Sequence, residues 1–284
     1  MRSTMFGLVG AVIIVTSGAC AGISGGRSGD DSRPGGDAGI AHPDGADQLV
    51  LRVEVGGGFV PAEARLLQIP GFSLFGDGRV VITGAQIEIY PGPALPNLQV
   101  RSVTEEGVQA ILEAARAAGL EGPDRHHDNP TVIDAPSTTF TVIADGYRHV
   151  TTVDALHEGD PAHQELRAFD EKLGNLEPWL PKGSVTAEEP FRFAGLRVFV
   201  MPEFPEGGEE LPQEEKAWPV STPLSSFGTP VKGQPDVRCG VVEGSDLEAL
   251  RPLAQDANQL TPWRSGDEVY HLVFRPLLPD ESGC

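Results

Sequence analysis

STTFTVIADGYRHVTTVDAL, residues 137–156, has two runs of β-branched and aromatic residues on either side of an Asp-Gly pair. Asp145 and Gly146 suit the centre of a two-residue hairpin turn, because both central positions of such a turn adopt positive φ. The flanking runs are rich in Val, Thr, Phe and Tyr, which favour strands. The stretch therefore predicts an antiparallel hairpin with a sheet around it.

Two further segments extend this sheet toward the amino terminus. Residues 48–60 alternate apolar and polar side chains, which is typical of a strand with one buried face. Residues 72–83 place apolar runs on both sides of Gly76-Asp77-Gly78 and predict a second hairpin. The Pro-rich residues 91–98 predict a connection, because proline cannot donate a ladder hydrogen bond.

Two helices are predicted to pack on the sheet. The first follows Thr104, a suitable N-cap, and stops at Gly119. The second begins at Asp160-Pro161. Each has one apolar face, made by Val108, Ile111, Leu112 and Ala115 in the first and by Leu166, Phe169 and Leu173 in the second.

The carboxy-terminal part predicts a second, smaller unit after a linker at 181–190. Strands are expected in 195–204, 237–244 and 269–279, with a short helix that starts in a capping box of Ser245 and Glu248 and is kinked or ended by Pro252. Trp218 and Trp263 are expected in its core or at its rim. The predicted fold is α+β, with two small domains at 48–180 and 191–284, each an antiparallel or mixed sheet with packed helices.

The amino terminus carries an export pattern. Arg2 precedes an apolar run at residues 5–16, which is too short for a bilayer span of about 20 residues but fits the hydrophobic region of a signal peptide. Small residues and then Cys20 follow this run. A signal peptide is therefore expected at 1–19.

Ser17, Gly18, Ala19 and Cys20 resemble the lipobox of bacterial lipoproteins, although Ser17 replaces the usual Leu or Val. The resemblance implies that Cys20 is lipidated with a diacylglyceryl group and further acyl chains such as palmitate. It also implies anchoring to the cell membrane on the extracytoplasmic face, and durable anchoring needs more than one chain. Two alternatives stay open, namely secretion after cleavage at Ala19-Cys20-Ala21 and an uncleaved anchor.

Residues 20–47 are mostly Gly, Asp, Ser and Ala, and they predict a flexible, disordered tether between the lipid and the folded part. His42 and the aspartates of this segment are expected to be solvated. Beyond Cys20, only Cys239 and Cys284 remain, and in an oxidising compartment they are expected to form a disulfide bond. The alternative is two unrelated free thiols.

The order of LFGDGRV, TEEGVQAILEAARAAGL and VIDAPSTTFTVIADGYRHV, followed by a helix that ends near Leu173, resembles a lipoprotein-associated domain family of unknown function. The resemblance covers residues 65–175. Its shared motifs are turns and helix caps, so it implies a fold and carries no catalytic residue to this chain.

The net charge excludes one class of partner. With 41 acidic and 21 basic residues the formal net charge is −20, and such a chain repels the phosphates of nucleic acids. Anionic lipid headgroups are repelled for the same reason. Membrane attachment is therefore expected to depend on the lipid anchor at Cys20.

Catalytic motifs are not evident. No G-x-S-x-G, P-loop, dinucleotide or H-E-x-x-H motif occurs in the folded part, and no cofactor is predicted. Histidines and aspartates do recur between residues 124 and 163, and three of them brought together would suit zinc. We therefore expect a non-enzymatic binding or structural role in the envelope, with a metal-dependent envelope hydrolase based on residues 124–163 as the alternative.

Overall fold

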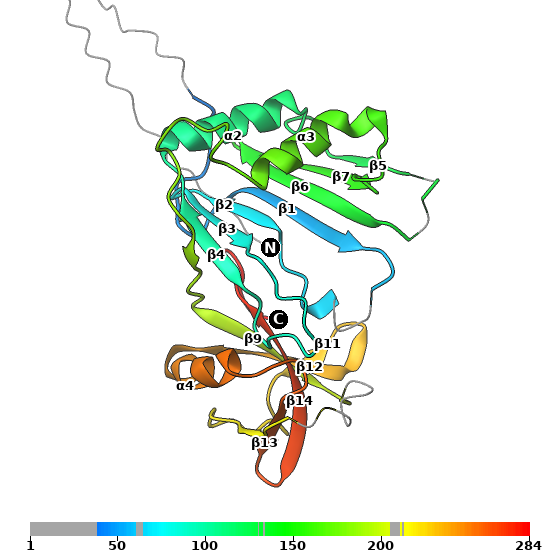
Figure 1. The fold of residues 1–284 in the computed structure, drawn as a ribbon, viewed down its shortest axis with the longest axis vertical. Helices are drawn as coiled ribbons and strands as arrows, with labels where there is room; N and C mark the ends of the chain where they lie inside the picture. The colour runs from blue at the N-terminus through cyan, green and yellow to red at the C-terminus, as the bar shows by residue number, and fades with distance from the viewer. Residues whose placement is uncertain (1–38, 61–64, 130, 133, 205–210, 212) are drawn as a thin grey trace, which may run out of the picture. The chain divides into compact units, whose positions relative to one another are not determined.

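A computed structural model of the chain describes residues 39–60, 65–129, 131–132, 134–204, 211 and 213–284. It confirms the predicted α+β class, with two mixed sheets and three helices in the described part (Figure 1). The predicted signal peptide, Cys20 and residues 21–38 of the predicted tether lie outside the described residues. The two sheets have separate hydrophobic cores, yet Ala38–Cys284 forms one compact unit.

The first sheet has eight strands in the order β5-β7-β6-β1-β2-β3-β4-β8. All neighbours are antiparallel except β5 and β7, which are parallel. The strands are β1 (Leu49–Gly57), β2 (Phe72–Phe75), β3 (Arg79–Thr83), β4 (Leu98–Ser102), β5 (Arg125–His127), β6 (Pro136–Ala144), β7 (Tyr147–Asp154) and β8 (Glu189–Pro190).

The predicted hairpins have the expected turns. β6 and β7 pair from Ala144 and Tyr147 back to Ser137 and Asp154, with Asp145 and Gly146 at positive φ between them. In the β2–β3 hairpin the backbone N–H of Gly78 donates to the carbonyl of Phe75 at 2.9 Å. Glycine suits this position because its φ is 81°.

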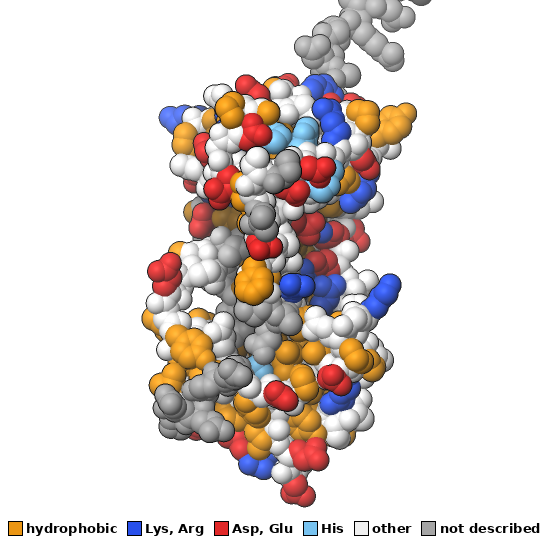
Figure 2. Space-filling view, turned by 90° about the vertical axis from the view of Figure 1, so that its right-hand side faces the viewer, with side chains coloured by type: hydrophobic (Ala, Val, Ile, Leu, Met, Phe, Trp, Pro, Cys, Tyr) orange, Lys and Arg blue, Asp and Glu red, His pale blue; other side chains and the backbone are white. Residues whose placement is uncertain are grey.

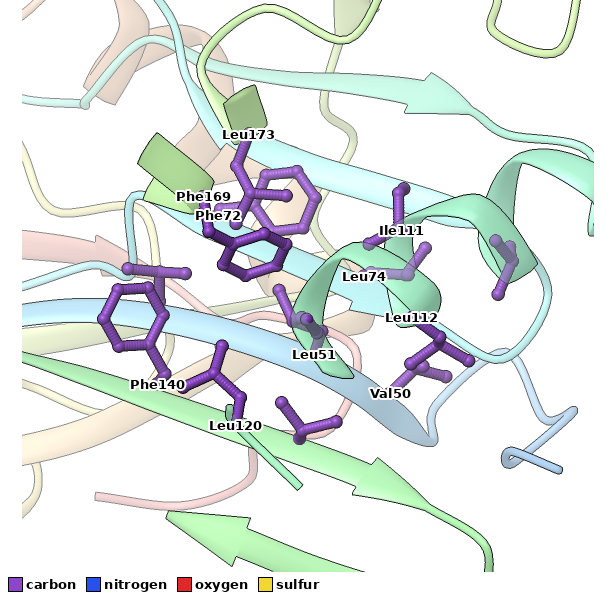
Figure 3. Packing of buried hydrophobic residues seen from close by; sticks show 14 of the residues in the cluster. Val50, Leu51, Phe72, Leu74, Ile111, Leu112, Leu120, Phe140, Phe169 and Leu173 are labelled. Carbon is purple, nitrogen blue, oxygen red and sulfur yellow. The ribbon is translucent and has the colours of Figure 1, made fainter. Parts of the chain in front are cut away.

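Helices α2 (Glu105–Ala117) and α3 (Gln164–Leu173), the latter preceded by the 3-10 turn η1 (Pro161–His163), cover one face of this sheet (Figure 1). Thr104 caps α2 as predicted, since its hydroxyl accepts from the N–H of Gly107. The apolar faces of both helices meet the side chains of β1, β2 and β6 (Figure 3). The largest buried residues here include Leu51, Leu74, Ile111, Leu112 and Phe140.

The second sheet has six strands in the order β10-β13-β14-β9-β12-β11. Only β10 and β13 are parallel. The strands are β9 (Gly195–Met201), β10 (Lys216–Ala217), β11 (Thr229–Val231), β12 (Gln234–Glu243), β13 (Pro262–Ser265) and β14 (Glu268–Pro276). Trp218 and Trp263 are both buried in its core, which is one of the two places predicted for them. Their rings pack edge to face.

Helix α4 (Gly244–Gln255) does not begin as the sequence predicted. It begins at Gly244, so the predicted capping box of Ser245 and Glu248 does not form its start. The reason is that β12 continues as far as Glu243. Gly244, at a φ of 56°, then turns the chain directly into the helix. Of the two effects predicted for Pro252, it does not end the helix, because α4 continues to Gln255 with Leu250 and Ala254 on both sides of the proline buried in the core. A kink at Pro252 stays a prediction.

Part of the predicted tether packs on the first sheet's helix. Residues 39–47 belong to the described chain, and Ile40 is buried beside α2. The side chain of Gln109 accepts from the N–H of Ile40 at 2.7 Å and donates to its carbonyl at 2.9 Å. His42 bonds Glu105 at 3.1 Å and is not the solvated residue expected. The Gly-rich composition concealed this contact, because only one apolar side chain makes it.

The segment predicted as a linker runs along the first sheet. Val185 forms an isolated bridge with Val103, and Glu189–Pro190 pairs with β4. Phe191, directly after it, packs against side chains of both sheets. Residues 181–190 are therefore hydrogen-bonded to the first sheet, and Phe191 at their end connects the two cores.

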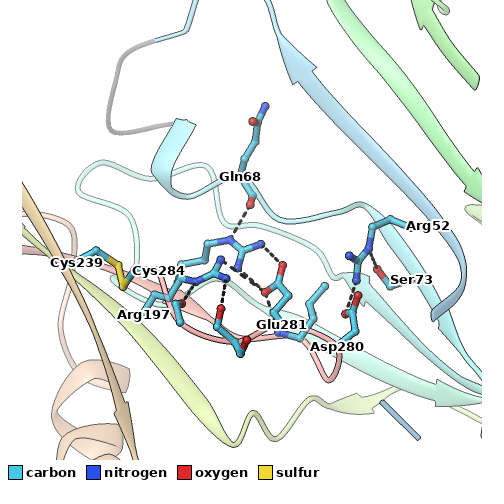
Figure 4. A network of polar contacts seen from close by, with 12 residues as sticks. Arg52, Gln68, Ser73, Arg197, Cys239, Asp280, Glu281 and Cys284 are labelled. Carbon is cyan, nitrogen blue, oxygen red and sulfur yellow. Dashed lines mark hydrogen bonds and ion pairs between the residues drawn. A yellow bond between two sulfur atoms is a disulfide. The ribbon is translucent and has the colours of Figure 1, made fainter. Parts of the chain in front are cut away.

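The carboxy-terminal segment 277–284 joins the two sheets through a polar network (Figure 4). Arg275 at the end of β14 pairs with both oxygens of Glu281, at 2.6 and 2.7 Å, and donates to the carbonyl of Gln68 at 2.8 Å. Arg52 of β1 donates to Asp280 at 2.7 Å. Cys284 forms a disulfide bond with Cys239 of β12, the pair expected from the sequence.

Candidate functional site

Three of the histidines and aspartates of residues 124–163 meet around strand β5, namely His126, Asp128 and Asp154. This short strand pairs in parallel with β7, with His126 opposite Thr152. Asp154 lies at the end of β7, where Ser137 of β6 is its partner. The sheet therefore brings together three side chains that are separated by up to 28 residues in sequence.

His126 lies between two carboxylates. Its Nε2 is 3.0 Å from Oδ1 of Asp154, and its Nδ1 is 3.5 Å from Oδ1 of Asp128. The Ser137 hydroxyl donates to the same oxygen of Asp154 at 2.5 Å and fixes this carboxylate. His126, Asp128 and Asp154 are the only group in the described chain with the spacing of a possible metal site.

The charges of this group stabilise one another. The hydrogen bond to Asp154, aided by the charges of Asp154 and Asp128, raises the pKa of His126 above its ordinary value of 6.5. The Ser137 hydroxyl, followed by His126, lowers the pKa of Asp154. The arrangement holds a carboxylate pair that favours a positive charge at the imidazole position.

His127 points to the other face of the strand, as alternation requires. Its ring lies edge to face with that of His163, with centroids 5.0 Å apart. Burial, and next the charge of His163, lowers the pKa of His127. His163 is buried, and its Nδ1 has no hydrogen-bond partner among the described residues.

The other histidines of the segment stand apart. His157 bonds Asp170 of α3 at 3.0 Å, and burial raises the pKa of this carboxyl although His157 opposes the rise. His149 contacts the carbonyl of Gly122 at 2.8 Å. Three histidines therefore do not converge on one point, as a zinc hydrolase with a His₃ site would require.

An apolar cleft of about 490 Å³ lies at the second sheet. Its floor is β14 and the turn before β13, with Leu260, Leu272, Val273 and Phe274 nearly inaccessible to solvent. The wall opposite this floor is the connection between β3 and β4. The residues of this wall are Gln86, Ile87, Ile89, Tyr90, Gly92, Pro93, Ala94, Leu95 and Pro96.

Backbone hydrogen bonds hold the two walls of the cleft together. The N–H of Ala94 donates to the carbonyl of Ala257 at 3.0 Å, and the N–H of Gln259 donates to that of Gly92 at 2.9 Å. The side chain of Gln259 also accepts from the N–H of Gly92 at 3.2 Å. The cleft is therefore formed before any ligand enters.

Few polar atoms in the cleft remain without a partner. The two ring nitrogens of His271 lie 3.2 Å from the carbonyl of Glu203 and 3.1 Å from that of Gln259. Gln86 donates to the carbonyls of Gly84 and Asn97. The surface offered to a ligand is consequently mainly hydrocarbon.

The rim of the cleft exposes large apolar side chains. Ile87, Ile89 and Tyr90 are 66%, 60% and 61% exposed. Figure 2 shows hydrophobic side chains gathered over the second sheet, and histidines close to acidic groups at the opposite end of the view. Exposed clusters of large apolar residues on a soluble surface commonly mark binding sites.

The remaining residues predicted from sequence are placed as follows. Cys20 lies outside the described residues, whereas Cys239 and Cys284 are bonded to each other. No helix within the described ranges is long and apolar enough to cross a membrane.

Compared with known protein families, curated proteins and solved structures, the chain matches none.

The cleft was not predicted from the sequence. Its wall comes from residues 84–97, which show no regular pattern, and its floor from a strand almost 200 residues later. One signal was present: Ile87, Ile89 and Tyr90 are apolar residues in a segment too rich in Gly and Pro for a buried strand. Apolar side chains without a predicted strand or helix to bury them indicate an exposed apolar surface.

Proposed function

We propose that this chain is an exported lipoprotein, anchored through Cys20 to the outer face of the cell membrane, whose folded part binds a small, neutral, mainly hydrocarbon ligand. The ligand would occupy the cleft between residues 86–96 and β14 without being chemically changed. The observation that carries the binding role is the cleft itself, with its apolar floor and exposed apolar rim.

The size and lining of the cleft support this ligand class. Small-molecule sites in proteins typically measure about 300–1,000 Å³ and are mainly apolar. The cleft falls in this range at about 490 Å³. His271 and Gln86 are hydrogen-bonded to protein carbonyls, and the side-chain oxygen of Gln259 accepts from Gly92. A ligand rich in polar groups would therefore lose its hydrogen bonds to water with little replacement.

Charge argues against an anionic ligand. The chain has a formal net charge of −20, and none of the described residues that line the cleft is Lys or Arg. A carboxylate or phosphate inside it would be desolvated without a cation to pair with. An uncharged acyl chain or ring system meets neither obstacle.

Titration with the neutral fluorescent probe N-phenyl-1-naphthylamine tests the binding role. We expect saturable binding to the full mature chain, and we expect Ile89→Glu and Ile87→Glu to weaken it about tenfold or more, because each places a carboxylate at the apolar rim. Both side chains are exposed, so the fold should tolerate the changes.

Tyr147→Glu is the matched control. Tyr147 is 70% exposed on β7 and does not line the cleft. Its substitution should leave probe binding unchanged. Equal binding by wild type and both rim variants, or no saturable binding at all, would refute the proposed ligand site.

Mass spectrometry of the intact protein from its native membrane tests the anchor. We expect a chain that begins at Cys20 and carries a diacylglyceryl group, with the Cys239–Cys284 disulfide intact. Cys20→Ser should keep residues 1–19 or release the chain from the membrane. A native protein that retains residues 1–19 and bears no lipid would overturn the lipoprotein proposal.

A further inference from the structure

His126 differs from the other histidines in having a carboxylate at each ring nitrogen, and with Asp128 and Asp154 it forms what we call the His126 group. Asp154 faces Nε2 at 3.0 Å and Asp128 faces Nδ1 at 3.5 Å. His149 has a single backbone carbonyl, and His157 has the single carboxylate of Asp170. A ligating carboxylate on one nitrogen and an orienting carboxylate on the other is the arrangement found around metal-bound histidines.

We propose that His126 Nε2 and a carboxylate oxygen of Asp154 bind a divalent transition-metal ion of the zinc class, and that Asp128 positions the imidazole through Nδ1. In this state Nδ1 carries the proton and donates it in a hydrogen bond to Asp128. Nε2 then presents its lone pair to the metal. The site is separate from the apolar cleft and does not depend on it.

The spacing of the ligand atoms fits this class of ion. Zinc–nitrogen and zinc–oxygen bonds of about 2.0–2.2 Å at tetrahedral angles put two ligand atoms about 3.3 Å apart. Nε2 of His126 and Oδ1 of Asp154 are 3.0 Å apart, so a shift of a few tenths of an ångström accommodates the ion.

Strand pairing holds the ligands in place. His126 and Asp154 lie on the neighbouring strands β5 and β7, and the Ser137 hydroxyl of β6 donates to the Asp154 carboxylate. The side chains of His126 and Asp128 are 56% and 79% exposed, which leaves space for water molecules at the remaining positions. An ion can therefore enter directly from solvent.

The donor set selects among ions. Imidazole with carboxylate suits Zn²⁺, Cu²⁺ and Ni²⁺, whereas Mg²⁺ and Ca²⁺ prefer oxygen ligands alone. Two carboxylates beside one neutral imidazole give the site a negative charge that a dication neutralises. Zinc should consequently bind in the presence of excess magnesium.

Isothermal titration of ZnCl₂ into the full mature chain, prepared without a polyhistidine tag and freed of metal with a chelator, tests the proposal. We expect one zinc ion per chain at this site. His126→Ala and Asp154→Asn should abolish its binding, and Asp128→Asn should keep the stoichiometry while affinity falls by about 10–100-fold. MgCl₂ at tenfold excess, on the order of millimolar, should not compete.

His157→Ala is the matched control, because it removes the other His–Asp pair of 3.0 Å separation and leaves the His126 group intact. Its zinc binding should equal that of wild type. Circular dichroism checks that each variant is folded. If Asp154→Asn does not fold, zinc binding by His126→Ala alone decides whether the site exists.

Three results would overturn the proposal. These are wild-type protein that binds no zinc, His126→Ala that binds it as well as wild type, and His157→Ala that loses it. Displacement of zinc by magnesium would refute the stated class of ion. An unchanged affinity in Asp128→Asn would refute the positioning role of Asp128.

Discussion

Arg52 Nη2 lies 2.7 Å from Asp280 Oδ1, and this ion pair links β1 of the first sheet to the segment that follows β14 of the second. Both side chains are largely buried, and Arg52 also donates to the Ser73 hydroxyl at 3.1 Å. A charge buried at such a boundary is costly unless it is paired, so removing either partner should destabilise the contact between the sheets.

Asp280→Asn should reduce the free energy of unfolding by about 1–3 kcal/mol, because the buried charge of Arg52 would face a neutral amide oxygen in place of a carboxylate. Urea denaturation followed by circular dichroism measures the change. Glu248→Gln is the control, since Glu248 is 76% exposed and its pair with Arg251 should contribute less than about 1 kcal/mol. Equal effects of the two substitutions would contradict the structural role of the Arg52–Asp280 pair.

Glu281 should make stability depend on acid pH. Burial alone would raise its pKa, but hydrogen bonds from Arg275 and from the N–H of Leu278, with the charges of Arg275 and Arg197, lower the pKa below its ordinary value. Between the folded and the unfolded pKa of Glu281, the unfolded chain therefore binds more protons than the folded chain. The stabilisation is complete above the unfolded pKa of about 4.5 and is lost as pH falls through the folded pKa.

Urea midpoints at several values from about pH 3 to pH 7 check this dependence. Glu281→Gln should be less stable than wild type at pH 7, and its stability should fall less steeply below about pH 4.5. Parallel pH curves for wild type and Glu281→Gln would show that Glu281 is not the group responsible.

Removal of the disulfide bond should cost about 2–4 kcal/mol. It closes a loop with a sequence separation of 45, for which the chain-entropy model gives about 4 kcal/mol. Cys284→Ser is the cleaner test because Cys284 is exposed, whereas Cys239 is buried in the second sheet. Reducing agent should lower the urea midpoint of wild type and leave that of Cys284→Ser unchanged; a reducing agent without effect on wild type would contradict the prediction.

Phe140→Ala should be among the most damaging changes in the first sheet. Its ring is fully buried at the centre of the core, 6.2 Å from that of Phe169 (Figure 3). Large-to-small changes of this kind cost about 3–5 kcal/mol. Thermal unfolding measures the loss, with the exposed Tyr147→Ala as control, and a cost below about 1 kcal/mol would mean that Phe140 is not packed as described.

Local features of the fold were predictable because their causes are local. Asp145-Gly146 imposes a turn and Thr104 caps a helix whatever surrounds them, and both were found as expected. The start of α4 was not predictable in the same way. Gly244 turns strand into helix, and the pairing that extends β12 to Glu243 comes from β9, some 45 residues earlier.

The candidate sites depended even more on distant pairing. The residues around His126 were singled out by their chemistry, but parallel pairing of β5 with β7 decides which of them meet. The contact of Ile40 with Gln109 and the cleft between residues 86–96 and β14 join segments whose own sequences carry no mark of their partner. Composition could indicate which residues were available, whereas topology determined which became neighbours.

The strand order of the second sheet has a consequence for the export proposed above. β9 lies inside this sheet, and both of its neighbours, β12 and β14, follow it in the chain. If the chain is exported as proposed and emerges from its translocation channel amino end first, both edges of the apolar strand β9 stay unpaired until β12 has emerged. The edge that pairs with β14 then stays unpaired until residue 276 has come through. During that interval we expect a chaperone to engage β9, and chains arrested at this stage should aggregate through it.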